Sequence, residues 1–379
     1  MKERRNLCVV KVGGSLLRDG KSYIEAAENI KKIFVERDRL PIVVVSAAKG
    51  VTDLLIEVAK GSKTHLEAVV EKYMSIANEF ASPKLSRRVY EELEHLRRVA
   101  NTISGSFDAA LQDLIISFGE RISKILMVEA LENANLRAVE LNARELIMTN
   151  NIHGDASIDY VATANNLEKI INSILETSAI PVIEGFIGAT EDGVITTLGR
   201  GGSDYTATAI ASLLGIDDVY LVTEVDGIMT ADPALIPSAR IVKVMSYREA
   251  MEAALHGAKR INPKAFEPLE KFYGSTVFIG SWRTFGTRIQ RELSADLAGP
   301  KLAMCKTSGD IPYIAIIGEG VGNTKFLKMI IDILYEKDFN ILGIQSYYYR
   351  PSILVYVQKT EELKILRELH KSIFEGVGS

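Results

Sequence analysis

The sequence predicts an α/β protein in which helices cover a mostly parallel sheet, followed by a small α+β module. Short β-branched segments alternate with longer helical patterns along most of the chain, which is typical of parallel sheets with crossover helices. Residues 294–301 are rich in small side chains and include a Gly-Pro pair, which indicates a boundary. A chain of 379 residues is long enough for two such domains.

Five short, apolar segments rich in β-branched residues are predicted to form the first sheet. They are residues 8–12, 41–47, 136–143, 179–186 and 217–223. The helices expected between them are residues 24–37, 161–176 and 206–214. From about residue 56 to residue 124 the pattern is helical and charged, so we expect a helical excursion that partly covers the site. Residues 1–295 are assigned to this first domain.

Residues 301–379 are predicted to form the second domain. The strands expected in it are residues 301–306, 313–319, 341–347 and 352–358, and the helices are residues 324–337 and 361–374. Two helices on one face of an antiparallel-rich sheet make an α+β module of the ferredoxin-like type.

The composition is that of a soluble globular protein, with 47% apolar and 25% charged residues. A net charge of −4 argues against general nucleic-acid binding, which usually requires a basic surface. Cys8 and Cys305 lie in apolar segments, so we expect reduced thiols rather than a disulfide. We find no signal sequence and no apolar segment long enough to cross a membrane, and we expect a cytoplasmic protein.

A tight turn after the first predicted strand has the character of an anion site. Lys11 lies inside the strand, and Gly13, Gly14 and Ser15 form the turn. A Walker phosphate-binding loop needs its two glycines five residues apart, directly before a lysine. The distance from Gly14 to Gly20 is one residue too long, so the sequence excludes a Walker loop and leaves a different kind of anion site.

A second glycine-rich segment, residues 199–202, leads into a predicted helix that begins with Ser203 and Asp204. Glycines let a ligand approach the backbone closely, and the N–H groups at a helix start favour an anion. Arg200 adds a planar group that suits a carboxylate or phosphate. Asp204 would fit beside an anion only if it neutralised a cation, such as a lysine or Mg²⁺. An ordinary capped helix would explain Ser203 and Asp204, but not an arginine between glycines.

Three further segments contribute candidate residues. Ser46 and Thr52 are placed at the end of a strand, where ligands bind in open α/β sheets. Glu120 lies among apolar residues at a helix turn, where its default interpretation is a carboxylate in a helix salt bridge. Lys259 follows a loop at residues 223–233 and is weak evidence when taken alone.

Taken together and in this order, these segments resemble aspartate kinase, a member of the amino-acid kinase superfamily. The elements that match its motifs are residues 11–15, Ser46 with Thr52, and residues 117–120, 185–188, 199–206 and 257–259. The resemblance continues into the tail, where residues 366–375 look like the end of the family's regulatory ACT domain. It implies a three-layer αβα amino-acid kinase fold with a mostly parallel central sheet, and a small C-terminal ACT (ferredoxin-like) domain.

The resemblance implies phosphorylation of the β-carboxylate of L-aspartate by ATP and Mg²⁺, the first step toward threonine, methionine and lysine. The catalytic residues it implies are Lys11, Asp204 and Lys259. The substrate would be bound by Ser46, Thr52, Glu120, Phe186, Arg200 and Ser203. Arg200 would bind a substrate carboxylate, and Glu120 would bind the ammonium group. The nucleotide would be bound by Lys11, Gly13, Gly14, Ser15, Gly202, Thr223, Glu224, Gly227, Met229, Asp232 and Lys259.

Four residues depart from the family's usual pattern near the nucleotide. Glu224, Met229 and Ala234 occupy the positions of an aspartate, an aromatic residue and an arginine, and Asn262 replaces a histidine. These departures leave the nucleotide preference open. The five histidines are scattered without metal-ligand spacing, so no protein metal cage is predicted and Mg²⁺ is expected to arrive with the nucleotide.

Two other functions stay open at this point. A different amino-acid kinase on the same scaffold, such as a homoserine kinase, would phosphorylate a hydroxyl and would need a base near it. A catalytically weak subunit could instead sense an amino acid and regulate a partner. The family usually has two ACT modules and only one fits here, so we expect pairing with a second copy in a homodimer or larger assembly. An effector such as threonine or lysine is possible in that module.

Overall fold

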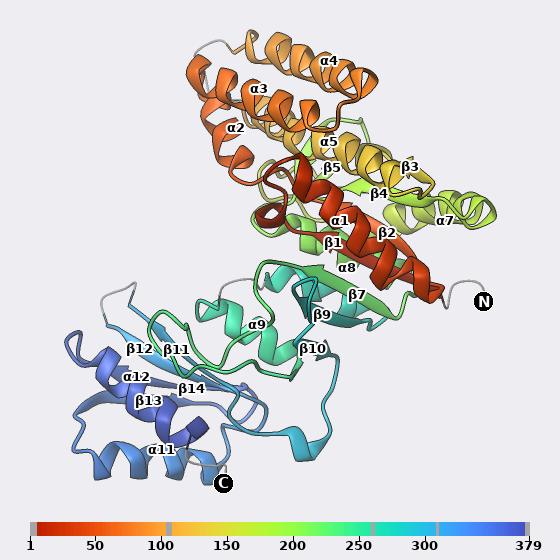
Figure 1. The fold of residues 1–379 in the computed structure, drawn as a ribbon. Coiled ribbons are helices and arrows are strands. Elements are labelled where there is room, and N and C mark those ends of the chain that lie inside the picture. Colours follow the sequence, from red (N-terminus) through yellow and green to blue (C-terminus); the bar gives the residue numbers. More distant parts are fainter. Residues whose placement is uncertain (1–5, 104–107, 259–261, 308–310, 376–379) are drawn as a thin grey trace. The chain divides into compact units, whose positions relative to one another are not determined.

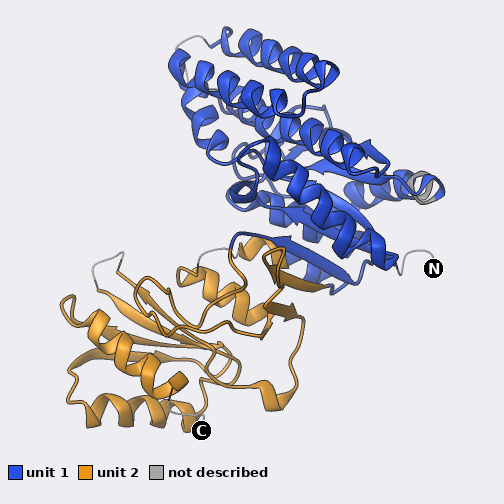
Figure 2. Cartoon of the chain, viewed as in Figure 1, with its two compact units in different colours: residues 1–224, 267–275 blue, residues 225–266, 276–379 orange. Residues whose placement is uncertain are grey.

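The computed structural model describes residues 6–103, 108–258, 262–307 and 311–375. The chain forms two compact units, which are coloured separately in Figure 2. Unit 1 comprises residues 1–224 and 267–275, and unit 2 comprises residues 225–266 and 276–379. The domain boundary predicted between residues 295 and 301 stays a prediction.

Unit 1 is built on parallel strands in the order β3-β4-β2-β1-β7. Their bounds are β1 (Leu7–Val12), β2 (Leu40–Val45), β3 (Ala138–Glu140), β4 (Ile180–Glu184) and β7 (Asp218–Val222). β2 and β4 are almost wholly buried, as expected for parallel strands covered on both faces. All five predicted strands are therefore present, although β3 is shorter than expected. A two-stranded antiparallel hairpin adds β5 (Ile187–Ala189) and β6 (Ile195–Thr197).

Helices form the outer layers of unit 1 (Figure 1). Their bounds are α1 (Gly20–Ile33), α2 (Val51–Ala59), α3 (Lys63–Asn78), α4 (Pro83–Ala100), α5 (Ala109–Asn133), α6 (Ala143–Leu146), α7 (Tyr160–Thr177), α8 (Gly202–Leu214) and α10 (Glu267–Lys271). α5 packs beside α1 and contacts β2, β3 and β4, whereas α8 packs beside α7 and contacts β1, β2 and β7. The predicted arrangement of a parallel sheet between helical layers is confirmed.

Helix α1 begins four residues earlier than predicted, at Gly20. The Asp19 side chain accepts a hydrogen bond from the backbone N–H of Ser22, and the Ser22 hydroxyl oxygen accepts one from the N–H of Asp19. This reciprocal capping box fixes the start of a helix. The Gly-Lys-Ser sequence at residues 20–22 is therefore a helix start and not a phosphate loop.

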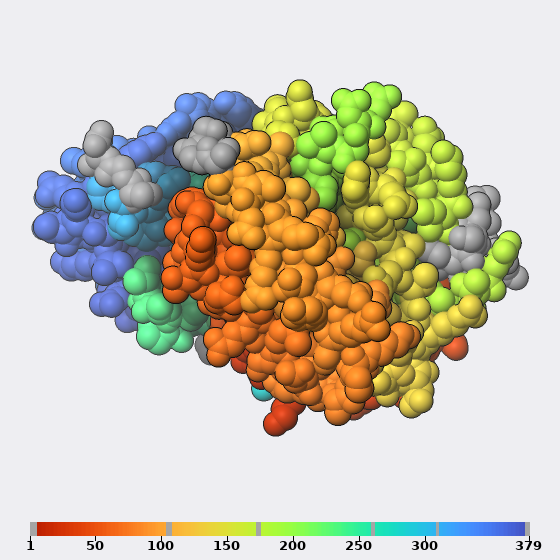
Figure 3. Space-filling view, turned by 90° about the horizontal axis from the view of Figure 1, so that it is seen from above, coloured from red at the N-terminus to blue at the C-terminus, as the bar shows by residue number. Residues whose placement is uncertain are grey.

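The helical excursion consists of α2, α3 and α4, in which α3 packs between α2 and α4, and α2 and α4 pack against α5. α4 is amphipathic, and its buried side chains recur at helical spacing (Leu85, Val89, Leu93 and Leu96). Side chains of α3 and α4 form a continuous part of the surface of unit 1, orange in Figure 3.

Unit 2 contains three neighbouring strands in the order β9-β10-β8 and a separate antiparallel sheet in the order β11-β12-β14-β13. The bounds are β8 (Val244–Ser246), β9 (Thr276–Gly280), β10 (Thr287–Gln290), β11 (Leu302–Lys306), β12 (Tyr313–Ile317), β13 (Ile341–Ser346) and β14 (Ser352–Val357). Its helices are α9 (Tyr247–Leu255), α11 (Thr324–Glu336) and α12 (Glu362–His370). α12 packs beside α11 and contacts β11 and β12, so the predicted α+β module is confirmed.

Both cysteines are free thiols. Burial raises the pKa of Cys8 to about 12 and that of Cys305 to about 11, so neither thiol is reactive at neutral pH. Among the helices of the described residues, none has the length and apolar character that crossing a membrane requires.

Candidate active site

A cavity of about 490 Å³ lies in unit 1 beyond the carboxyl ends of β1 and β2. Ligands of open α/β sheets bind at this edge. Eight predicted site residues line the cavity: Lys11, Ser46, Thr52, Glu120, Phe186, Arg200, Gly202 and Ser203. Lys11 and the second glycine-rich segment therefore face one cavity, as the sequence predicted, although they are almost two hundred residues apart in the chain.

An ion pair joins the two glycine-rich regions. Lys11, near the end of β1, places its Nζ 2.8 Å from Oδ1 of Asp204 in the first turn of α8. Both side chains are only 15% exposed, which limits screening by water. The pair holds the lysine ammonium in one position at the edge of the cavity.

The first turn requires its glycines because neighbouring backbone is too close for a side chain. A Cβ on Gly13 would lie 2.9 Å from the carbonyl oxygen of Val222, and one on Gly14 would lie 2.5 Å from that of Ala47. The N–H of Gly13 donates to the Val222 carbonyl at 3.1 Å. Gly13, Gly14 and Ser15 thus form a tight turn directly after β1, but they are not among the cavity-lining residues.

The second glycine-rich segment has two residues in the left-handed region, Gly199 with φ +78° and Gly201 with φ +72°. Glycine adopts this conformation without the cost that other residues bear. A Cβ on Gly202 would lie 2.9 Å from the ring of Phe186, so the segment also packs closely on that residue. This backbone conformation places Arg200 and the first turn of α8 at the wall of the cavity.

Serine and phenylalanine side chains complete one wall. The Ser46 hydroxyl donates to Oγ of Ser203 at 3.0 Å, linking the end of β2 to the start of α8. Phe186 has φ +70°, which is strained for a bulky residue and is held by its N–H bond to Oγ1 of Thr206. Thr52 lines the cavity from the first turn of α2, so its predicted place at the end of a strand was wrong.

Glu120 lies in the middle of α5 and is only 3% exposed. Its Oε1 accepts a hydrogen bond from the N–H of Ala47 at 3.1 Å, whereas Oε2 has no hydrogen-bond partner among the described residues. Burial raises the pKa of this carboxyl to about 8. The default interpretation of a helix salt bridge was wrong, since no basic side chain in the described ranges forms an ion pair with it. An unpaired carboxylate oxygen in a cavity is suited to a cationic ligand.

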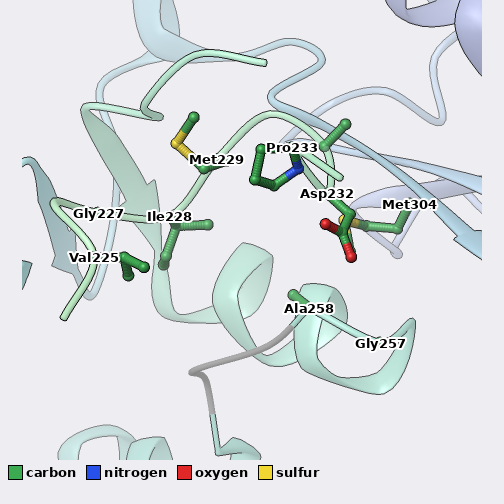
Figure 4. Close-up of a pocket in the computed structure, with 10 residues that line it drawn as sticks. Val225, Gly227, Ile228, Met229, Asp232, Pro233, Gly257, Ala258 and Met304 are labelled. Atoms are coloured by element: carbon green, nitrogen blue, oxygen red, sulfur yellow. The ribbon is translucent and has the colours of Figure 1, made fainter. Parts of the chain in front are cut away.

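A second pocket, of about 190 Å³, lies in unit 2 (Figure 4). Among the predicted nucleotide residues, Gly227, Met229 and Asp232 line it. Figure 4 shows the loop bearing Met229 and Asp232 on one side and the Gly257–Ala258 turn on the other. The other lining residues are Val225, Ile228, Ala231, Pro233 and Met304.

Thr223 and Glu224 follow β7 in unit 1 and are not among the residues that line this pocket. Lys259 lies outside the described residues, so its predicted role is not placed. Ala234 and Asn262, two of the four departures from the motif, do not line the pocket either.

Two comparisons decide the family. The model of the amino acid kinase family matches residues 6–281. Lysine-sensitive aspartokinase 3 of Escherichia coli (strain K12) is 31% identical over 367 residues, which are 95% of this chain and 77% of that protein. The chain belongs to the aspartokinases of the amino acid kinase family.

Other aspartokinases match over a smaller share of their length. The aspartokinase of Rickettsia prowazekii is 31% identical over 67% of this chain, and the match spans 49% of that protein. The crystal structure of E. coli aspartokinase III in complex with aspartate and ADP has a TM-score of 0.84 at 23% identity. That match covers 97% of this chain and 100% of the other, and it confirms the predicted amino-acid kinase fold.

Among the buried residues of this aspartokinase site that the sequence did not predict, Asp113 has the most polar contacts. Asp113, seven residues before Glu120 on α5, lines the same cavity and is 1% exposed. Its carboxylate is hydrogen-bonded to His153 Nδ1 at 2.8 Å and accepts from the N–H of Gly154 at 3.1 Å. It also accepts from the hydroxyl of Thr197 at 2.5 Å and from its N–H at 3.1 Å. A seven-residue spacing puts two acids on one helix face, which was the available signal.

Proposed function

We propose that this protein transfers the γ-phosphoryl group of ATP to the β-carboxylate of L-aspartate, giving 4-phospho-L-aspartate. The observation that supports it best is the cavity of unit 1, which combines Lys11, Arg200 and the start of α8 with Glu120, whose Oε2 has no partner among the described residues. Such a set offers positive groups for phosphate and carboxylate, and one acid for an ammonium group. An α-amino acid with an acidic side chain carries the carboxylates and the ammonium group, and ATP carries the phosphates.

The reaction needs little proton chemistry from the protein. An aspartate side chain has a pKa near 4 in water, so the attacking carboxylate is already ionised at neutral pH. The main barrier is to bring two anions together in line, which fixed cations and N–H dipoles lower. Lys11 and the positive N-terminal end of the α8 dipole would perform this work for the phosphoryl group.

Asp204 would act by holding Lys11, to which it is paired at 2.8 Å. Within the described ranges, no group of three or more His, Cys, Asp or Glu side chains could hold a metal ion. We propose that Mg²⁺ would arrive with ATP, held mainly by its phosphates and water, and would supply positive charge there.

The amino-acid substrate would be bound by two side chains of opposite charge, Arg200 and Glu120. Arg200 would bind a carboxylate through its planar guanidinium, and Oε2 of Glu120 would accept a hydrogen bond from the substrate ammonium. This contact would supply the partner that the buried oxygen lacks in the free protein. Ser46 and Ser203 would contribute hydroxyl groups to the same wall.

We propose that the pocket of unit 2 receives the nucleoside part of ATP. Its walls are mostly apolar (Val225, Ile228, Met229, Pro233 and Met304), which suits the faces of a base. Asp232 is the charged residue of the lining and would accept a hydrogen bond from a sugar hydroxyl.

We further propose that unit 2 pairs with a second copy and binds an amino-acid effector. β13 lies at the edge of its sheet, and an unpaired edge favours strand pairing. Three large hydrophobic side chains on β13 and α11 are strongly exposed: Leu342 at 56%, Ile331 at 45% and Tyr335 at 85%. Sedimentation of the whole chain as a monomer at micromolar concentration would contradict the pairing. The structure of E. coli aspartokinase III with lysine and aspartate motivates lysine as the first effector to test.

Hydroxylamine trapping tests the proposed reaction directly. The protein, ATP and Mg²⁺ are incubated with aspartate or, separately, with homoserine. An acyl phosphate reacts with hydroxylamine to give a coloured hydroxamate, whereas a phosphate ester does not. We expect colour with aspartate only. Consumption of ATP with homoserine and not with aspartate would indicate the alternative hydroxyl kinase instead.

A further inference from the structure

The loop that forms the pocket of unit 2 is built into the hydrophobic core of the C-terminal module. Ala231 and Ile236 are 2% and 4% exposed and belong to the same core cluster as the sheet residue Ile316 and the helix residues Leu366 and Leu369. Ala231 also lines the pocket. One side of this loop therefore faces the pocket and the other is part of the core under α12.

Thr230 lies between two pocket residues, Met229 and Ala231, and its backbone is paired on both sides. Its N–H donates to the carbonyl of Arg240 at 2.8 Å, and its carbonyl accepts from the N–H of Ala303 on β11 at 2.7 Å. Its hydroxyl oxygen accepts from the N–H of Arg240 at 3.0 Å. The hydroxyl has one further contact, 2.8 Å from Nε2 of His370 at the end of α12.

The network around His370 fixes which ring nitrogen carries the proton. His370 is fully buried, and its Nδ1 lies 3.2 Å from Oε1 of Glu375, which also accepts from the Ser238 hydroxyl. An ionised carboxylate can only accept, so Nδ1 carries the hydrogen and Nε2 accepts from the hydroxyl of Thr230. Burial lowers the pKa of His370, which is consistent with a neutral ring. Both ring nitrogens of the buried imidazole and the Thr230 hydroxyl thereby have hydrogen-bond partners.

We propose that His370 is a positioning residue of the unit 2 pocket. Through Thr230 it holds Met229, Ala231 and Asp232 in the arrangement that accepts the nucleoside. The inference rests on the proposed function in one respect only, which is the identity of the pocket's ligand. His370 touches no ligand itself, so its loss should weaken nucleotide binding without removing a reacting group.

Two substitutions separate this role from a general effect on folding. His370→Leu keeps an apolar side chain in the buried site but removes the bond to Thr230. His370→Gln places an amide near the position of Nε2 and can retain that bond. For the leucine variant we expect a KM for ATP raised about fivefold, the scale of one net hydrogen bond, with kcat and the KM for aspartate within twofold of the parent. The glutamine variant should recover most of the parent's KM for ATP.

Hydrogen exchange of residues 225–233, measured without any ligand, gives a readout that does not depend on the reaction. We expect faster deuterium uptake there in His370→Leu, but not in His370→Gln. A folded leucine variant with unchanged exchange and unchanged KM for ATP would overturn the inference and leave the proposed reaction intact. Absence of hydroxamate from the parent protein would instead reject the proposed reaction, while the exchange experiment would still decide the role of His370.

If His370→Leu fails to fold, Thr230→Val provides the same test from the other side of the bond. Valine matches the shape of threonine and lacks the hydroxyl, so this variant also loses the bond from the Arg240 N–H, and the changes in KM for ATP and in exchange should be at least as large. Parent values in a folded Thr230→Val protein would overturn the inference.

Discussion

The cavity of unit 1 and the pocket of unit 2 are built in different ways. The cavity depends on charged groups held by short-range backbone geometry, with Lys11 paired to Asp204 and two glycines in left-handed conformations. The pocket is mostly apolar, and its loop is held by the core of the C-terminal module. Charge should therefore decide catalysis in the first, whereas packing should decide affinity in the second.

The largest effect is expected from removing the central cation of the cavity. Lys11→Ala should lower kcat by about 10²–10³-fold, because one preorganised group at the developing charge is lost. Asp204→Ala should act in the same direction by releasing Lys11. The rate of hydroxamate formation measures both. Lys21→Ala, an exposed lysine at the start of α1, is the matched control and should be normal. Near-normal turnover in either cavity variant would contradict the roles assigned.

A smaller effect is expected when the guanidinium group of Arg200 is replaced by an ammonium group, which keeps the positive charge. Arg200→Lys keeps the positive charge but loses the planar, two-pronged contact with a carboxylate. The KM for aspartate should rise about tenfold or more, while the KM for ATP stays within about twofold. Equal increases in both constants would mean that Arg200 does not distinguish the two ligands.

The pH dependence should reveal Glu120. Because burial raises its pKa to about 8, this carboxyl is mostly protonated at pH 7 in the free protein and then lacks the negative charge that attracts an ammonium group. The kcat/KM for aspartate should therefore increase as the pH rises from 7 through 8, and then level off. Glu120→Gln should lower kcat/KM and remove this increase. A parent profile that is flat between pH 7 and 8.5 would count against the assignment.

Raising the pH should increase kcat/KM through Glu120 but decrease the stability of the free protein through the same group. The folded pKa, about 8, exceeds the ordinary value of 4.5, so the folded state binds more protons between these two pH values. The contribution of Glu120 to the free energy of unfolding should therefore fall as the pH rises through that interval. Urea unfolding at pH 5 and pH 8 measures it, and Glu120→Gln should show the smaller difference between the two.

The smallest effect is expected in the pocket of unit 2. Met304→Ala removes apolar contact from one wall and should raise the KM for ATP about threefold with kcat unchanged. Met304→Leu keeps a similar volume and should behave like the parent. A large drop in kcat for the alanine variant would contradict the separation of charge and packing between the two sites.

Residues whose surroundings are local could be predicted from the sequence. Lys11, Gly13 and residues 199–202 were found because a strand, a turn and a helix start are each encoded within a few neighbouring positions. His370 could not be found in that way, and for Asp113 the only local signal was its seven-residue spacing from Glu120. The partner Thr197 is 84 positions from Asp113, and Thr230 is 140 positions from His370. Such contacts arise from chain topology, for which a single sequence carries no direct signal.

The burial of Ala231 and Ile236 beneath α12 has a practical consequence for dissecting this protein. A shortened chain that stopped near residue 300 would lose the partners of both side chains and present them to water. Such a fragment would be prone to aggregation rather than being a simpler enzyme. A chimaera that takes its C-terminal module from a relative should fold only if residues 230–239 come from the same relative. We therefore expect residues 230–239 and the C-terminal module to evolve together.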